Sequence, residues 1–520
     1  MNSMRKGSLY QVKALLQHLN EPSQLLKDEL VAAHFKMLRQ PIPQDPLGLR
    51  KIVREFVTAA VALLTPRQRS IIIRADLRGE VHRALAASLG ISERYFYKER
   101  RQALVCLANV LVTAVPFRQV RIQTADATAD NFEYVEALKR VGSAGSAIVM
   151  LEAVVASDTS ADFRLRAASG LPLLLADVGS LNAAARALDV ARGLLNQSQV
   201  SVEEALLPQN EIELADAKIT WLRASVSEAE AKVRRVIANL HGSFSENKNT
   251  ELLGAALLLL FDILAYRGVF GEMLTIALDA QEALEDTPNS VLAVRTLGAV
   301  AYAQHYVTGT TAMSTQNLIL ANDMAMRIGA VSESLSMTMM LCGMYMLRGE
   351  PKRGLDLALP RMSTARFTAP AEALIAYFNV SLATSLAGQA PVARALIGQA
   401  MAQMPPRSRC PPLLQLAAAE AAISEKRYAE ALSLATSAGA HFEATLGTRL
   451  FGHALFVQAL ANEGLDNHRK ALHLIREAVK ACEQFGSPFS RYRAYSISNT
   501  LSGKRKHARN AAEVLASLQA

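Results

Sequence analysis

The amino-acid sequence predicts an all-α protein, with a small basic domain at its amino-terminal end followed by a long solenoid of helical hairpins. Hydrophobic residues make up 51% of the 520 residues but aromatic residues only 6%. The apolar content is therefore mostly Leu, Ala, Ile, Val and Met, which favours helices over strands. Apolar residues also recur at three- and four-residue spacings, and turn residues recur at a nearly constant interval from about residue 250 onward.

The positive charge of the chain is unevenly distributed. Residues 1–122 contain 20 Lys and Arg residues against 9 Asp and Glu residues, whereas the remainder contains 36 against 38. A single basic domain is typical of a protein that binds phosphates, although it also suits an acidic protein partner or an anionic membrane.

The amino-terminal part divides into short helical stretches. Two are expected between residues 9 and 39, before a proline-rich linker at 39–48, and a third is expected over residues 49–64. The predicted organisation has an N-terminal helical segment, a helix-turn-helix domain, a linker and a helical-repeat solenoid. Their ranges are 1–45, 46–116, 117–130 and 131–520.

Residues 82–104 have the pattern of two helices joined by a tight turn. Ala86 provides the small side chain that a steep helix crossing needs, and Gly90 suits the turn between the helices. Ile91 and Phe96 provide apolar wedges, and Ser92 is a good N-cap for the second helix.

The second helix of this pair is predicted to have one cationic and one apolar face. Arg94, Tyr95, Lys98 and Arg101 recur at helical spacing, whereas Phe96, Ala103 and Leu107 point the other way. This division is typical of a recognition helix that enters the major groove of DNA.

At these residues the chain resembles the DNA-binding region of bacterial sigma factors and the related LuxR-type output domain. The segment LTPRQRSIII, residues 64–73, is similar to the opening of that module, and the resemblance covers roughly residues 46–112. The chain departs from the pattern at Phe96, where a small branched residue is usual, and at Glu99, where an apolar residue is expected. These departures predict a rotated or repacked second helix, and an ordinary hairpin with a solvated basic face is the alternative.

The resemblance implies a DNA-binding surface on the second helix. Arg94, Tyr95 and Lys98 would contact base edges. The remaining cations would hold phosphates, Ser92 would contact a phosphate or only cap the helix, and Glu93 would accept from a cytosine or only favour the helix dipole. The expected surface comprises Arg83, Ser92, Glu93, Arg94, Tyr95, Tyr97, Lys98, Arg100 and Arg101.

The rest of the chain is predicted to be a stack of helical hairpins. The last six turn positions are separated by 41, 40, 39, 38 and 38 residues. The turns and the small residues after them resemble the tetratricopeptide repeat, with residues 428–432 as the best match. We expect eight or nine hairpins between residues 131 and 490 and a capping helix after 491. The predicted turns are at Gly142, Gly179, Ser225, Gly268, Gly309, Gly349, Gly388, Lys426 and Gly464.

Two features of the solenoid are candidates for ligand binding. Trp221 is the only tryptophan and lies on a predicted first helix, the kind that lines the concave face of such solenoids. Met340 and Met344 belong to a methionine-rich helix that would suit a deformable binding surface. Packing in the interior of the solenoid is the favoured alternative for all three side chains.

The sequence contains none of the motifs that would indicate catalysis. It has no phosphate-binding glycine loop, no H-E-x-x-H and no nucleophile elbow, so we expect no enzymatic activity, no metal site and no cofactor. The four cysteines show no metal or redox spacing, and no apolar run is long enough for a signal peptide or a membrane span. We therefore expect a cytoplasmic protein of bacterial type that does not associate with membranes.

These observations favour a DNA-binding transcription regulator. Its basic module would bind double-stranded DNA, and its repeat domain would bind a protein, peptide or small-molecule effector. Most such readers bind paired half-sites, which makes a homodimer the expected assembly on DNA. The alternative is a repeat scaffold or adaptor whose helix-turn-helix module contacts a protein such as RNA polymerase.

Overall fold

The computed structural model describes most of residues 2–32 and 49–113, residue 135, and most of residues 144–519. The linkers expected at 39–48 and 117–130, and the turns expected at Gly142, Gly309 and Gly349, lie outside the described residues. Within the described stretches the gaps are residues 20–21, 29, 51–52, 55–56, 58–59, 62–63, 65, 78–79, 158–159, 199–200, 243–247, 288–289, 309–310, 329, 348–349, 368–369, 405–409, 486–487 and 504.

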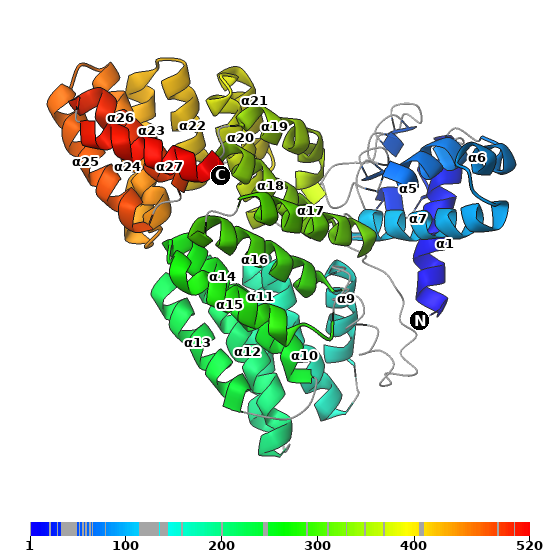
Figure 1. The fold of residues 1–520 in the computed structure, drawn as a ribbon. Helices are drawn as coiled ribbons and strands as arrows, with labels where there is room; N and C mark the ends of the chain where they lie inside the picture. The colour runs from blue at the N-terminus through cyan, green and yellow to red at the C-terminus, as the bar shows by residue number, and fades with distance from the viewer. Residues whose placement is uncertain are drawn as a thin grey trace.

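Every regular element among the described residues is a helix, which confirms the predicted all-α class. Figure 1 shows a small group of amino-terminal helices beside a large, curved array of hairpins. The amino-terminal helices are α1 (Asn2–His18), α2 (Pro22–Leu25), α5 (Pro66–Ile71), the π-helix η1 (Ile72–Leu77), α6 (His82–Ser88) and α7 (Glu93–Thr113).

One apolar core holds the amino-terminal helices together. Val12 and Leu15 of α1 pack in the same cluster as Leu104 and Leu107 of α7, and all four side chains are at most 1% exposed. The expected boundary between residues 45 and 46 therefore does not separate two cores. The same cluster includes Val331, the first residue of a repeat helix, so the amino-terminal helices also pack against the repeat domain.

The repeat domain begins with α9 (Ala144–Val155) and continues as pairs of antiparallel helices. The pairs are α10 (Ala161–Asp177) and α11 (Leu181–Gln197), α12 (Val202–Leu222) and α13 (Val226–Gly242), α14 (Lys248–Arg267) and α15 (Phe270–Ala283), α16 (Val291–Thr308) and α17 (Thr311–Ile328), α18 (Val331–Leu347) and α19 (Pro351–Ala358, continued by the 3-10 helix η2, Leu359–Phe367), α20 (Pro370–Leu386) and α21 (Ala390–Ala402), α22 (Pro412–Ser424) and α23 (Tyr428–Ala444), α24 (Thr448–Gly464) and α25 (His468–Phe485), and α26 (Pro488–Ser502) and α27 (Arg505–Gln519).

The turns inside the pairs lie where the sequence placed them. Gly179, Gly268, Gly388 and Lys426 all have φ between 60° and 77°, a left-handed conformation that reverses the chain after a helix. In two other turns this conformation is adopted by a neighbour of the predicted residue: Ala224 (φ 67°) next to Ser225, and Asp466 (φ 61°) two residues after Gly464. The chain ends in the α26–α27 hairpin rather than in the single capping helix that we predicted.

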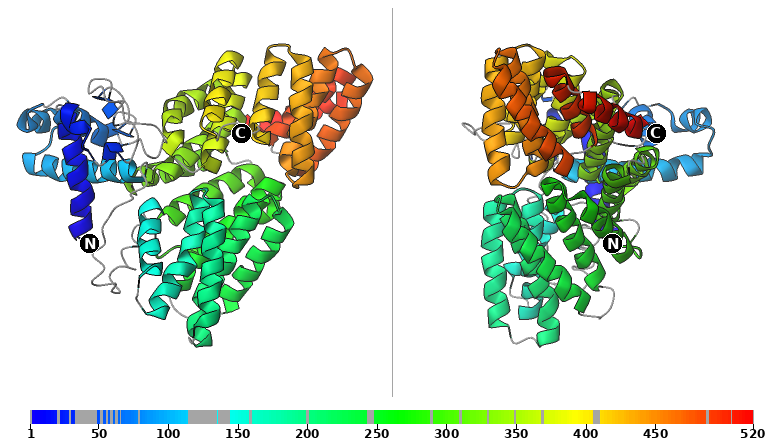
Figure 2. Two further views of the ribbon diagram at one scale, coloured as in Figure 1. Left: turned by 180° about the vertical axis from the view of Figure 1, so that it is seen from behind. Right: turned by 60° about the vertical axis from the view of Figure 1, so that its left-hand side comes forward.

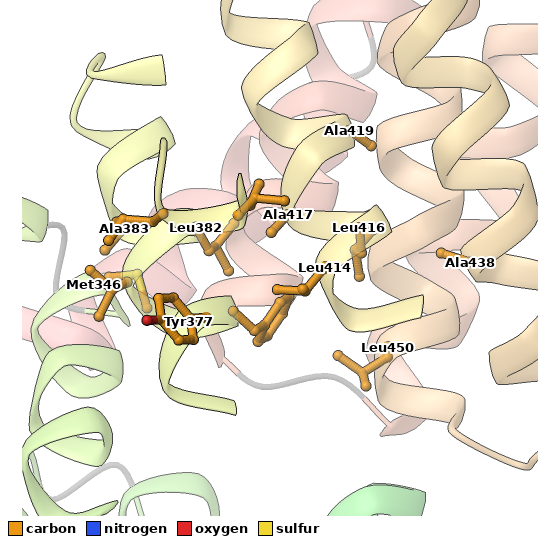
Figure 3. Close-up of a cluster of buried hydrophobic side chains, with 14 of the residues drawn as sticks. Met346, Tyr377, Leu382, Ala383, Leu414, Leu416, Ala417, Ala419, Ala438 and Leu450 are labelled. Atoms are coloured by element: carbon orange, nitrogen blue, oxygen red, sulfur yellow. The ribbon is translucent and has the colours of Figure 1, made fainter. Parts of the chain in front are cut away.

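The first helix of each pair contacts the first helix of the next, from α10 to α26. Elements on the inside of a curve lie closer together than those on the outside, so the first helices form the inner face of the array. Small side chains allow the helices to pack closely. Ala417 and Ala419 of α22 and Ala438 of α23 are fully buried in the same apolar cluster as Leu414 and Leu450 (Figure 3).

The array also makes a contact between distant hairpins. The hydroxyl groups of Tyr266 (α14) and Thr445 lie 2.6 Å apart, and the Thr448 hydroxyl donates to the Arg267 carbonyl oxygen. Arg449 of α24 donates to the Tyr302 hydroxyl of α16. A solenoid with only neighbour contacts would lack these bonds, so the array curves far enough for α24 to meet α14 (Figures 1 and 2).

Candidate nucleic-acid interface

The α6–α7 pair is built on a small apolar core of its own. Phe96 of α7 is fully buried and packs with Leu85 and Ala86 of α6 and with Ile71 and Ala75 of the preceding helices. The aromatic ring thus fills the space between three helices, which accounts for the large side chain at this position. Because Phe96 fixes the rotation of α7, it also decides which residues of that helix face the solvent.

The turn and the cap have the geometry that the sequence predicted. Gly90 has φ +66° and no heavy atom within 4 Å of the position of an added Cβ, so the backbone conformation alone requires glycine there. The backbone N–H of Tyr95 donates to the Ser92 Oγ at 3.2 Å, which makes Ser92 the N-cap of α7. Its hydroxyl oxygen is therefore engaged at the start of the helix.

Four predicted residues share the solvent-exposed face of α7. Arg94, Tyr95, Lys98 and Arg101 are all exposed, and the Tyr95 side chain is 48% exposed. Within the part of the chain that the structure describes, no ion pair joins Arg94, Lys98 or Arg101 to an acidic side chain. These three cations are therefore available to an anionic partner.

An aromatic group borders this face. Tyr97 is 50% exposed, and its ring meets the rings of His82 and Phe96 edge-on at centroid distances of 5.5 and 5.7 Å. The Tyr97 hydroxyl lies 3.4 Å from the Nδ1 of His82. These contacts tie the start of α6 to α7 and leave the outer edge of Tyr97 accessible.

Other predicted contacts are already paired within the protein. The Arg100 guanidinium binds both carboxylate oxygens of Asp76, with the Nε–Oδ2 distance at 3.1 Å, so it points toward η1 and not toward a phosphate as we expected. The Arg83 Nε lies 3.4 Å from a carboxylate oxygen of Glu93, although both side chains are exposed. Surface pairs of this kind are weak, so a phosphate could still compete for Arg83.

Arg67 has a role at this surface that we did not predict from the sequence. Its Nε donates to Glu99 at 2.7 Å, and its guanidinium lies 6.0 Å from the centroid of the Tyr95 ring. The pair explains why Glu99 is tolerated where the resemblance expects an apolar residue, since its carboxylate lies on the surface against a cation of α5. In the sequence, the signal for this pair was the positive charge of Arg67, which is opposite in sign to Glu99.

The distal half of α7 joins the repeat domain. The Cys106 Sγ accepts from the Gln68 side-chain amide at 3.6 Å and donates to the Arg327 carbonyl oxygen of α17 at 3.7 Å. Val331, at the start of α18, is 7% exposed within the amino-terminal core. The cationic half of α7 is therefore free while its other half is attached to α17 and α18.

The ligand candidates of the repeat domain lie mainly in its interior. Met344 is 2% exposed in a core formed by α16, α17 and α18, and Met340 packs half-buried against the same cluster. Trp221 packs half-buried against the core around α14, with the Lys218 Nζ 5.7 Å from its ring centroid. These three side chains therefore pack in the interior of the solenoid, as we expected in preference to ligand binding.

The first helices also bring together a cluster of charged side chains that the sequence did not reveal. Successive first helices, from α10 to α20, each contribute one residue, and we call this set the inner charged row. The Lys218 Nζ lies 3.1 Å from Asp177, and Arg295 lies 3.1 Å from Asp262. The row comprises Asp177, Lys218, Asp262, Arg295, Glu333 and Glu372.

The inner charged row carries excess negative charge. Burial and the neighbouring Glu372 carboxylate raise the pKa of Glu333 to about 7, although Arg295 partly opposes the shift. Burial likewise raises the pKa of Glu372. Asp177 and Lys218 also act on Glu372, so the set holds four carboxyl groups against two cations. This imbalance favours an additional positive charge, which a basic side chain or an amino terminus of a bound chain would supply.

Comparisons with known proteins bear on the fold. No family model and no curated protein matches the sequence. The structure is similar to that of a Rap protein complexed with competence and sporulation factor, with a TM-score of 0.52 and 10% identity over 69% of this chain and 98% of that chain. This likeness confirms the predicted helical-repeat solenoid.

No described helix combines the length and the apolar character that a membrane span requires.

Two further structures match with lower scores. One is the Cut9–Hcn1 hetero-tetramer of the APC/C, with a TM-score of 0.46 and 11% identity over 97% of this chain and 96% of that chain. The other is a signal transduction ATPase with numerous domains and a tetratricopeptide repeat sensor from Pyrococcus horikoshii, with a TM-score of 0.37 and 12% identity over 88% and 72% of the two chains.

Proposed function

We propose that this chain is a repeat scaffold that binds a partner polypeptide on its inner face and double-stranded DNA through α7, and so acts as a DNA-binding regulator. The observation that carries the proposal is the exposed group Arg94, Lys98 and Arg101, which has no acidic partner among the described residues, on a helix whose opposite face is fixed by Phe96. Cations held in one orientation on a rigid helix suit a regular array of phosphates and base edges.

The position of each side chain along α7 suggests its role. Arg94, Tyr95 and Lys98 lie in the first two turns, which enter a major groove most deeply. Arg101 lies one turn further along and is suited to a phosphate. The exposed edge of Tyr97 borders the same surface, whereas Arg100 serves to hold α7 against η1.

The inner charged row is the proposed partner site. Its excess negative charge, which includes Glu333 and Glu372, favours a polypeptide that carries a basic group. The first turn of α18 links this site to the DNA module, because Val331 packs in the amino-terminal core and Glu333 follows two residues later. A partner that shifts this turn would therefore also act on the helices that hold α7.

The DNA-binding proposal is tested by measuring the affinity of the full chain for duplex DNA by fluorescence anisotropy. The variant R94A/K98A/R101A should bind at least about tenfold more weakly, since each such contact contributes on the order of 1–3 kcal/mol. The matched control R186A/R223A/K352A removes the same charge at exposed residues of the repeat. Equal affinities for the two variants would rule out α7 as the DNA-binding helix.

A second candidate function is an adaptor whose α7 contacts an acidic protein. Glu93 and Glu99 lie among the cations of this surface, and Arg67, Arg83 and Arg100 are engaged in ion pairs, so few charges remain for phosphates. The adaptor would bind duplex DNA weakly, and the α7 variant would change its protein partners instead. Affinity purification of the wild-type chain and the α7 variant would identify such a partner.

A further inference from the structure

The carboxyl-terminal end of the chain carries a second concentration of positive charge. Residues 467–520 contain ten Lys and Arg residues against three Asp and Glu residues. Residues 123–466, by contrast, contain 26 Lys and Arg residues against 35 Asp and Glu residues. The positive and negative charges of residues 123–520 nearly cancel, but residues 123–466 are acidic and residues 467–520 are basic.

The structure places much of this charge on one side of α25. Arg469, His473, Arg476 and Lys480 are separated by four, three and four residues, so they lie along one face of the helix, and all four are exposed. The opposite face, with Ala471 and Ile475 fully buried, packs into the array. Only Lys480 of these cations has an acidic partner among the described residues, Glu477 at 2.9 Å.

The neighbouring hairpin extends this surface. Arg505 and Lys506 begin α27 and are exposed, and Arg469 and Lys470 begin α25. The turns before these two helices belong to adjacent hairpins of the array, so both helix starts lie along the same edge. Cations in a first turn oppose the helix dipole, so helix stability does not account for them.

We infer that α25 and the start of α27 form a second binding surface for the phosphate backbone of duplex DNA. We call it the C-terminal cationic surface, and it comprises Arg469, Lys470, His473, Arg476, Arg505 and Lys506. Membrane association would call for exposed apolar side chains beside the cations. Within the described part of residues 468–519 no large hydrophobic side chain is exposed, which favours phosphates in water over a lipid surface.

The two cationic surfaces lie far apart. Figures 1 and 2 show α7 and α25 at opposite ends of the molecule. A short duplex bound at α7 would not reach α25, whereas a long duplex that follows or bends around the protein would contact both. The inference rests on the proposed DNA binding, and it adds that the repeat domain contributes to affinity without reading sequence.

The test compares R469A/K470A/R476A with the control R186A/R223A/K352A in the full chain, on a short duplex and on a long duplex. On the long duplex the C-terminal variant should bind more weakly, and its salt slope (log affinity against log salt) should fall by about 0.9 for each phosphate that the variant no longer neutralises. On the short duplex it should bind like the control. Equal affinity of variant and control on the long duplex would overturn the inference.

The design separates the two proposals. Weaker binding only in R94A/K98A/R101A supports α7 and contradicts the C-terminal cationic surface, whereas weaker binding only in R469A/K470A/R476A does the reverse. Vesicles of phosphatidylcholine and phosphatidylserine are the further probe. If the wild type binds these vesicles, the C-terminal variant does not, and both bind the long duplex equally, a membrane would replace DNA as the partner.

Discussion

The helices α7 and α25 are built alike, but the helices around them are held together differently. Both have an apolar face buried in the protein and a cationic face in solvent. The α6–α7 pair is anchored by the aromatic ring of Phe96. The hairpins on either side of α25 contain, in addition to their apolar contacts, a buried charged cluster on α22, α24 and α26, which we call the charged anchor. Arg493 of α26 binds the buried carboxylate of Glu420 on α22, and His453 of α24 lies 2.7 Å from the same carboxylate.

The two cationic faces also differ in composition. The α7 surface includes aromatic side chains, a serine and a glutamate beside its cations, which are groups that distinguish bases. The α25 surface carries arginine, lysine and histidine, with no Phe, Tyr or Trp between Arg469 and Lys480, which suits the uniform phosphate backbone. The apolar core holds α7 in a fixed rotation at any pH, whereas the charged anchor makes the contact of α26 with α22 and α24 sensitive to acid.

The largest expected effect comes from breaking the charged anchor. R493A would leave the Glu420 carboxylate, which is 3% exposed, without its guanidinium. Loss of one partner of a buried ion pair costs about 3–5 kcal/mol. Urea unfolding should show this loss of stability, and R493A/E420Q should regain part of it. An R493A chain as stable as the wild type would contradict the role of this anchor.

The charged anchor also predicts a dependence on pH. Burial holds the pKa of His453 below its usual value, and for Glu420 the effect of burial is outweighed by Arg493 and His453, which leave its pKa below the usual range. Stability should therefore fall as pH drops below about 6.5, and more steeply below about 4.3, as the unfolded chain takes up protons. The stability difference between wild type and R493A should narrow over this range. A stability difference between wild type and R493A that stays constant over this pH range would contradict the role of the charged anchor.

The apolar anchor of α7 should behave differently. L85A would remove a fully buried side chain that packs against Phe96, at a cost of about 2–5 kcal/mol. Because Leu85 packs among apolar side chains in this cluster, the cost should be nearly the same at acid and neutral pH. It should also weaken DNA binding by releasing the orientation of α7. Unfolding curves at two pH values measure the stability cost, and fluorescence anisotropy measures DNA binding. A stability cost that changes with pH would contradict the apolar anchoring of α7.

A smaller effect concerns the turns before the two helices. Gly90 and Asp466 have nearly the same φ, +66° and +61°, but only one of them is glycine. G90A should cost about 1–2 kcal/mol from the backbone conformation alone, since the added Cβ meets no atom. D466G should change stability by less than about 1 kcal/mol, because relief of strain and loss of chain entropy oppose each other. Thermal unfolding of both variants measures the contrast.

The sequence was most informative where local patterns decide the structure. The turn at Gly90, the cap at Ser92 and the repeat turns at Gly179, Gly268 and Gly388 follow from single residues and their spacing. The inner charged row could not be predicted, because six helices distant in sequence bring its members together. The pairing of Arg100 with Asp76 likewise depends on how η1 packs against α7.

The net charge summed over residues 123–520 did not reveal the cationic surface of α25. Over residues 123–520 the acidic middle cancels the basic end, so only a local sum would have revealed it. The packing role of Met344 was equally invisible, because a methionine-rich helix has the same sequence whether its sulphur atoms face a core or a ligand. Its burial is a property of the tertiary fold.

The most direct test of the central claim is the salt dependence of duplex binding by the full chain and by R94A/K98A/R101A. If Arg94, Lys98 and Arg101 contact DNA, the affinity of the wild type should fall steeply with salt. The slope for the variant should then be shallower by about 0.9 for each phosphate left without its cation. Slopes that coincide would show that the exposed cations of α7 do not bind DNA.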